Sequence, residues 1–145
     1  FVFLFFGWLG VFGSYFLQTH SIDLILFLPA SSIGFFTAAV LNINNMRDHK
    51  GDKESNKNTL VVKMGLANAK KYQILINSLG ILLMFIFLIP HPSSILMLII
   101  GGLLFIKPTI NLLKSYDYTT FDPYLKKQAI ATFLFSMLFV VSVNL

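Results

Sequence analysis

The sequence predicts an all-α protein, a polytopic membrane helix bundle with about five transmembrane helices. Apolar residues make up 56% of the 145 residues and charged residues only 12%, against about 25% charged in an ordinary soluble domain. A chain this short buries only part of its surface when it folds in water, so lipid is the solvent that suits this composition. The apolar residues run continuously, without the alternation that membrane strands show, and this favours helices.

Five stretches approach the length of about 20 apolar residues that a membrane-spanning helix needs. They cover residues 1–17, 24–41, 72–89, 95–113 and 129–145. The apolar run at the start has no initiating Met and no basic segment before it, so it does not read as a signal peptide. We therefore expect Phe1 to lie inside a longer natural chain, and residues 1–145 to form one partial membrane domain.

Basic residues are concentrated in and near two of the four connections between these stretches. The connections over residues 42–71 and 114–128 carry Lys or Arg, whereas those over residues 18–23 and 90–94 carry none. If each stretch crosses once, the two basic connections fall on one side, and the positive-inside rule makes that side cytoplasmic. We expect a multi-pass protein of the inner or plasma membrane. The net charge of +5 then needs no nucleic-acid partner, because the basic residues flank apolar stretches.

The polar segment that follows the second stretch holds the residues from which we predict chemistry. If the helix continues past Leu41, a set of polar side chains falls within an arc of about 120°: Asn42, Asn45, Asp48, His49 and Asp52. Asp48 and Asp52 are four residues apart, so their carboxylates are neighbours and repel each other unless a cation lies between them. Mg²⁺ suits such a pair, because it binds one or two carboxylates together with waters and substrate phosphates.

Basic side chains lie close to these carboxylates in the sequence. Arg47, Lys53 and Lys57 can neutralise phosphate oxygens, and Asn42 and Asn45 complete the predicted substrate-binding set. The spacing alone leaves a plain alternative open, since two aspartates four residues apart also occur on helices that are simply solvated.

The run NNMRDHKGDKESNKNTLVVKMG, from Asn44 to Gly65, resembles the second aspartate-rich motif of the UbiA-type intramembrane aromatic prenyltransferases. Asn45, Asp48 and Asp52 stand at the positions of D/N-x-x-D-x-x-x-D, and the residues that follow also match at Lys57, Thr59, Leu60 and Gly65. The segment NNMRD and the opening run FVFLFFGWLGVFGSYFLQT resemble the branch that prenylates 1,4-dihydroxy-2-naphthoate for menaquinone. Two departures are Asn56 and Asn58, where Gly and Arg are common, and the absence of the first aspartate-rich motif.

The resemblance implies the C-terminal part of a nine-helix bundle that transfers a polyprenyl group from polyprenyl diphosphate to 1,4-dihydroxy-2-naphthoate. Carboxylate is lost, and demethylmenaquinone is the product. Asp48 and Asp52 are then the catalytic and Mg²⁺-binding residues, and the substrate-binding residues are Asn42, Asn45, Arg47, Lys53 and Lys57. The implied partners are the lipid bilayer and an N-terminal half with the first motif, without which we expect the chain to be inactive.

Two alternatives remain open at this stage. The first is another branch of the same superfamily, acting in ubiquinone, tocopherol, chlorophyll or haem synthesis. The second is a piece of a membrane transporter or channel, in which ionisable residues would be expected near the centres of the spans. The five stretches contain almost none, apart from Lys107 near the end of the fourth.

Overall fold

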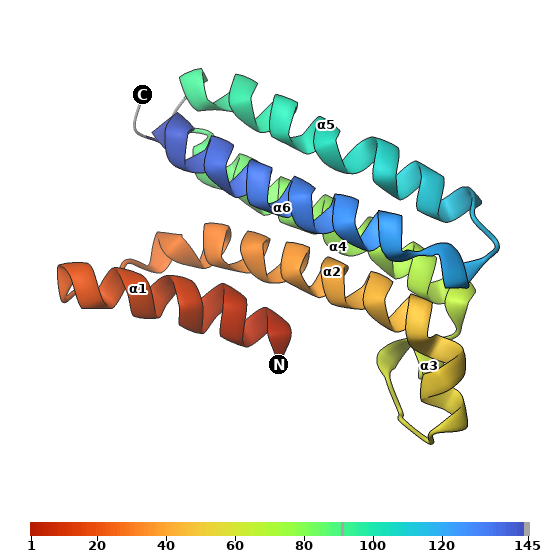
Figure 1. Cartoon of the computed structure of the whole chain (residues 1–145). Coiled ribbons are helices and arrows are strands. Elements are labelled where there is room, and N and C mark those ends of the chain that lie inside the picture. The colour runs from red at the N-terminus through yellow and green to blue at the C-terminus, as the bar shows by residue number, and fades with distance from the viewer. Residues whose placement is uncertain (91, 144–145) are drawn as a thin grey trace.

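The structure is a computed structural model that describes residues 1–90 and 92–143. In this part of the chain it contains helices and no strands, which confirms the predicted all-α class. Long helices lie alongside one another as a bundle, and a short helix projects from one end (Figure 1).

The first helical segment joins two geometries, a π-helix η1 (Phe3–Leu9) and an α-helix α1 (Gly10–Thr19). The short turn η2 (Leu24–Leu26) then leads into the longest helix, α2 (Phe27–Glu54). The remaining elements are α3 (Leu60–Met64), α4 (Leu66–Leu88), α5 (Pro92–Lys114), η3 (Tyr118–Thr120) and α6 (Asp122–Val143).

Four helical segments of the described chain are long and apolar enough to cross a membrane: Leu24–Glu54, Leu66–Leu88, Ser94–Lys114 and Asp122–Ser142. The segment Phe3–Thr19 is a shorter apolar helix. The helices extend well beyond the apolar stretches of the sequence, so residues 42–71 are mostly helical and α6 begins before residue 129. The physical reason is that hydropathy marks the apolar part of a helix, while polar residues such as Lys and Glu also propagate helices well.

Two breaks set the ends of helices around α3. After Glu54 the chain turns at Asn56, whose φ of 56° is left-handed, a conformation that Asn tolerates better than most residues. Thr59 then caps α3 by accepting a hydrogen bond from the Val62 backbone N–H at 3.3 Å. Gly65, with a φ of 79°, separates α3 from α4.

Aromatic packing joins α2, α4, α5 and α6. The ring of Phe36 on α2 stacks on Phe105 of α5 at a centroid distance of 4.5 Å, and meets Phe135 of α6 edge-on at 4.9 Å. Met84 and Leu88 of α4 complete this buried cluster. A second cluster lies where α2 meets α3 and η3, and includes Met46, Val61 and Phe121. These clusters fix the last turns of α2 against its neighbouring helices.

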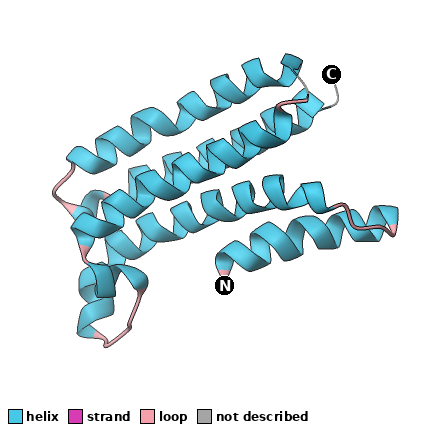
Figure 2. Ribbon diagram, turned by 180° about the vertical axis from the view of Figure 1, so that it is seen from behind, coloured by secondary structure: helices cyan, strands magenta, loops and turns pink. Residues whose placement is uncertain are grey.

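The first helix lies on the outer side of α2, as both views show (Figure 2). It approaches α2 backbone to backbone at Gly7: a Cβ there would stand 2.7 Å from the Ala30 carbonyl oxygen and 2.9 Å from the Gly34 Cα. Small residues at such crossings allow close helix packing in membranes.

We predict that Gly7→Ala lowers the free energy of unfolding by about 1–3 kcal/mol, because the added methyl meets backbone atoms that cannot move aside. Gly13→Ala is the matched control, since a Cβ at Gly13 meets nothing within 4 Å. Thermal unfolding in detergent measures the effect. Equal midpoints for the two variants would contradict the close approach of the first helix to α2.

Candidate functional site

The predicted site residues lie mainly on the last turns of α2, which we call the polar end of α2 (residues 42–54). The segment Leu24–Glu54 has 31 residues. At 1.5 Å per residue it is about 46 Å long, more than the roughly 30 Å of a bilayer's hydrocarbon core. The polar end therefore reaches past the apolar part of the helix.

Asp48 is held by two neighbours on its own helix. The Arg47 guanidinium donates to both carboxylate oxygens, from Nε to Oδ1 at 2.8 Å and from Nη2 to Oδ2 at 3.0 Å. The Asn44 amide donates to Oδ2 at 3.1 Å. Such a two-point pair fixes the direction as well as the position of the carboxylate.

Arg47 also forms an ion pair with Asp122, the first residue of the neighbouring helix α6. Its Nη1 lies 2.6 Å from Oδ1 of Asp122. The side chain of Asp122 is 71% exposed, so this ion pair adds little stability. Its effect is positional, because one guanidinium is shared by two carboxylates from helices far apart in the sequence.

Asp52 has a different environment, since it is buried, with 7% relative exposure. Its Oδ1 accepts from Lys57 Nζ at 3.2 Å, and its backbone oxygen accepts from the Lys57 N–H at 2.8 Å. The left-handed turn at Asn56 brings Lys57 back to this carboxylate. The Asp52 Oδ2 is buried and has no hydrogen-bond partner among the described residues. A carboxylate oxygen left in this way is costly, and a bound cation would satisfy it.

Asn42 and Asn45 line a hollow of about 220 Å³ with Tyr72 and Leu60 and with the first residues of the chain. The Asn42 amide, however, points its hydrogens into the bundle. It donates to the Ala69 carbonyl and to Gln73 Oε1, both at 2.9 Å. Its Oδ1 has no partner among the described residues.

Asn42 is thus one end of a buried amide network that joins the long helices. Gln73 Nε2 of α4 donates to Gln128 Oε1 of α6 at 3.4 Å, and Gln128 Nε2 donates to Asn77 Oδ1 at 3.0 Å. Asn77 in turn donates to Thr109 of α5 at 3.2 Å. The network places the polar end of α2 relative to α4, α5 and α6.

Two further polar residues of the segment are placed differently. The ring of His49 meets Tyr118 of η3 edge-on at 5.3 Å, and its Nδ1 is buried without a hydrogen-bond partner in the described part of the chain. Lys53 is exposed and forms no salt bridge with a described residue. The seven predicted site residues therefore divide into Arg47 with Asp48, Lys57 with Asp52, the two Asn around one hollow, and an exposed Lys53.

The sequence predicted Asn42 as a site residue, but did not indicate Asn44, Asp122, Gln73, Asn77 or Gln128. One signal for the amides was present: Gln73 and Asn77 are four residues apart in an apolar stretch, which places both on one helix face. Nothing in the sequence indicated the contact between Arg47 and Asp122, which are 75 residues apart.

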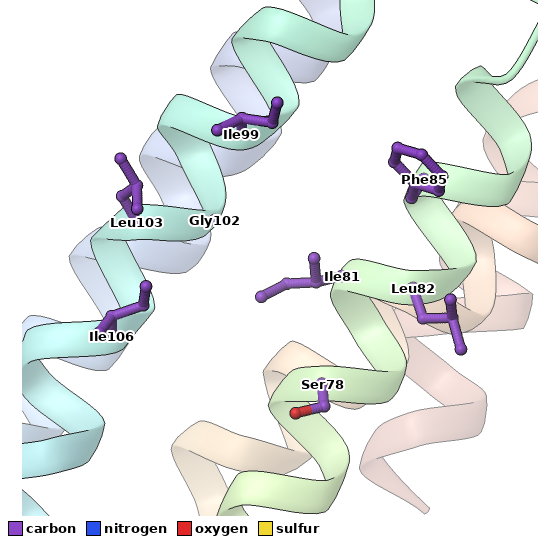
Figure 3. Close-up of a pocket in the computed structure, with 8 residues that line it drawn as sticks. All are labelled: Ser78, Ile81, Leu82, Phe85, Ile99, Gly102, Leu103 and Ile106. Atoms are coloured by element: carbon purple, nitrogen blue, oxygen red, sulfur yellow. The ribbon is translucent and has the colours of Figure 1, made fainter.

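A separate hollow holds none of these residues. It measures about 420 Å³ and lies between α4 and α5 (Figure 3). Apart from Ser78 and Gly102, its lining is aliphatic or aromatic: Ile81, Leu82, Phe85, Ile99, Leu103 and Ile106.

The carboxylates fit part of a divalent-cation site. Asp48 and Asp52 offer oxygen ligands one helical turn apart, and the unpartnered Oδ2 of Asp52 is a hard donor of the kind that Mg²⁺ binds. The described residues contain no cluster of three or more His, Cys, Asp or Glu that would hold a metal. Further ligands would therefore come from water, from substrate phosphates or from other parts of the protein.

Comparisons with known proteins identify relatives of this chain. The model of the UbiA prenyltransferase family matches residues 1–137. A 1,4-dihydroxy-2-naphthoate octaprenyltransferase of Escherichia coli (strain K12) is 37% identical over 146 residues, which cover 99% of this chain and 47% of that protein. A protein of the same description from Haemophilus influenzae is 48% identical over 81 residues, which cover 56% of this chain and 26% of that protein. The chain spans about half the length of the first relative. No solved structure gives a significant match.

We predict that Gln128→Leu lowers the free energy of unfolding by about 1–2 kcal/mol, because Gln73 and Asn77 lose a buried partner. The same change at the exposed Gln18 is the control and should leave stability unchanged. Thermal unfolding in detergent compares the two. A Gln128→Leu protein as stable as the control would show that the amide network does not hold the helices together.

Proposed function

The chain belongs to the UbiA prenyltransferase family, and on that premise we propose that it supplies half of an active site that prenylates 1,4-dihydroxy-2-naphthoate. The donor in this proposal is a polyprenyl diphosphate. The relatives from four bacteria that carry this description support the acceptor. The observation that carries the proposal is the pair Asp48 and Asp52, one oriented by Arg47 and the other buried with a free oxygen.

The proposed reaction begins when the bond between the allylic carbon and the diphosphate oxygen breaks. Diphosphate leaves with the electron pair, and an allylic cation remains. The ring carbon that bears the carboxylate forms a bond to this cation, and the carboxylate then leaves as carbon dioxide. The main demand on the protein is therefore to stabilise the negative charge that develops on the diphosphate.

Basic groups of this chain surround the place where that charge would develop. Lys57 Nζ lies 3.2 Å from Asp52 Oδ1, and Arg47 lies beside Asp48. We propose that both cations turn part of their hydrogen-bonding capacity to phosphate oxygens when the donor binds, because such charge-assisted bonds are strong. The exposed Lys53 adds positive charge to the polar end of α2.

Mg²⁺ held by Asp48 and Asp52 would supply charge neutralisation to the leaving diphosphate. The protein's own part is to hold the two carboxylates one helical turn apart and to exclude water from the allylic cation. The apolar lengths of α2 and α4 beside the polar end suit that second task, since water would quench an allylic cation.

We further propose that the remaining ligands come from a partner segment that carries a first aspartate-rich motif, and that the polar end of α2 faces the cytoplasm of the cell. The share of the relatives that this chain covers supports the first point. The concentration of basic residues between Arg47 and Lys71 supports the second.

We predict that Asp48→Asn and Asp52→Asn, made separately in the intact enzyme, each lower kcat by at least about a hundredfold, because each removes a carboxylate that would hold the cation that neutralises the diphosphate. Glu54→Gln is the matched control: it is the same type of change on the same helix, at an exposed residue. It should keep activity within about twofold. Chromatography of the prenylated product measures the rates. Full activity of the two Asn variants would exclude the proposed site.

We predict that the intact enzyme prenylates 1,4-dihydroxy-2-naphthoate and not 4-hydroxybenzoate when both are supplied with the same polyprenyl diphosphate. Mass spectrometry of the product identifies the acceptor and the loss of carbon dioxide. Preference for 4-hydroxybenzoate would contradict the proposed acceptor and indicate another branch of the family. Ion flux in liposomes without prenylation would indicate a transporter.

A further inference from the structure

Lys107 is a charged residue inside a helix of membrane-spanning length. It lies on α5, seven residues before the helix ends at Lys114. At 1.5 Å per residue, that places it about 10 Å below the end of the helix. Lys107 also lies within the apolar stretch 95–113, and charges inside such stretches are costly in a membrane and usually have a functional role.

A second lysine lies at a similar distance from the end of the neighbouring helix. Lys127 is five residues after the start of α6 at Asp122, which is about 8 Å of helix. The ends of α5 and α6 that carry these lysines lie side by side at the same end of the bundle (Figure 1). Both lysines line one hollow of about 360 Å³, together with Leu103, Leu104, Pro108 and Asn111.

No carboxylate of the described chain forms a salt bridge with either lysine, since the salt bridges found there involve Arg47 and Lys57. Two ammonium groups that face one hollow repel each other, and an anion between them removes the repulsion. The Asn111 amide adds a hydrogen-bond donor, while the leucines and the proline give an apolar wall. The hollow therefore suits a ligand with a negative head and an apolar tail.

We propose that this hollow binds an anionic phospholipid of the surrounding leaflet, with its phosphate at Lys107 and Lys127 and an acyl chain along Leu103 and Leu104. Basic pockets between membrane helices bind anionic head groups in this way. Both lysines are exposed in the described bundle, so a head group can reach them. The lining contains no carboxylate to retain the cation that accompanies a diphosphate, which argues against the prenyl donor. The larger hollow between α4 and α5 (Figure 3) has no charged lining residue.

The experiment is a lipid titration of the delipidated full-length protein in detergent, with bound lipid counted by native mass spectrometry. Dioleoyl phosphatidylglycerol is the anionic probe and dioleoyl phosphatidylcholine the matched zwitterionic one. The test variant is Lys107→Gln with Lys127→Gln. The control is Lys114→Gln with Lys126→Gln, which removes the same charge from the same two helices outside the hollow.

We expect wild type to prefer phosphatidylglycerol, and the test variant to lose about fivefold in its affinity for each lysine replaced. The control and the charge-retaining Lys107→Arg with Lys127→Arg should stay within about threefold of wild type. If the double variant does not fold, Lys107→Gln and Lys127→Gln are tested separately. Each should lose about fivefold in its affinity for phosphatidylglycerol. Equal phosphatidylglycerol affinity in test variant and wild type, or an equal loss in the control, overturns the proposal. Displacement of the bound lipid by a short prenyl diphosphate overturns it as well.

Discussion

The Asn42 side chain lies where the apolar part of α2 gives way to its polar end, and its two hydrogen bonds to α4 fix that boundary. In an apolar medium an amide without partners is costly, so the helices must meet where their amides can pair. Gln73, Asn77 and Gln128 meet this condition from α4 and α6. The register of the long helices, and with it the position of the last turns of α2, follows from this network of buried bonds.

The two carboxylates at the polar end of α2 have different hydrogen-bonding environments. Asp48 uses both oxygens in bonds to Arg47 and Asn44, whereas Asp52 is buried and keeps one oxygen free. In the proposed site, Asp48 would supply an oriented charge and Asp52 an oxygen that can bind a cation. The same chain carries a second charged feature at Lys107 and Lys127, which line a hollow outside this pair of carboxylates. The two features share no residue.

The sequence predicted the fold class well because continuous apolarity over a membrane's thickness permits little besides helices. It also placed Asp48 and Asp52 on one face, since a helix that continues past Leu41 determines their spacing. It could not predict that Arg47 binds Asp122, because that contact depends on how α6 packs. The pairing of Lys57 with Asp52 depends on a left-handed turn at Asn56, and no periodic pattern records such a turn. The observed helix ends lie beyond the ends of the apolar stretches, because hydropathy does not report where a helix stops.

The central claim is that Asp48 and Asp52 together hold a divalent cation that is shared with diphosphate. Electron paramagnetic resonance of Mn²⁺ added to the full-length protein, with and without inorganic diphosphate, tests this directly. Our account predicts that diphosphate strengthens Mn²⁺ binding, and that replacing the two aspartates by Asn together weakens it by at least about tenfold. Mn²⁺ binding that is unchanged in that double variant would contradict the account.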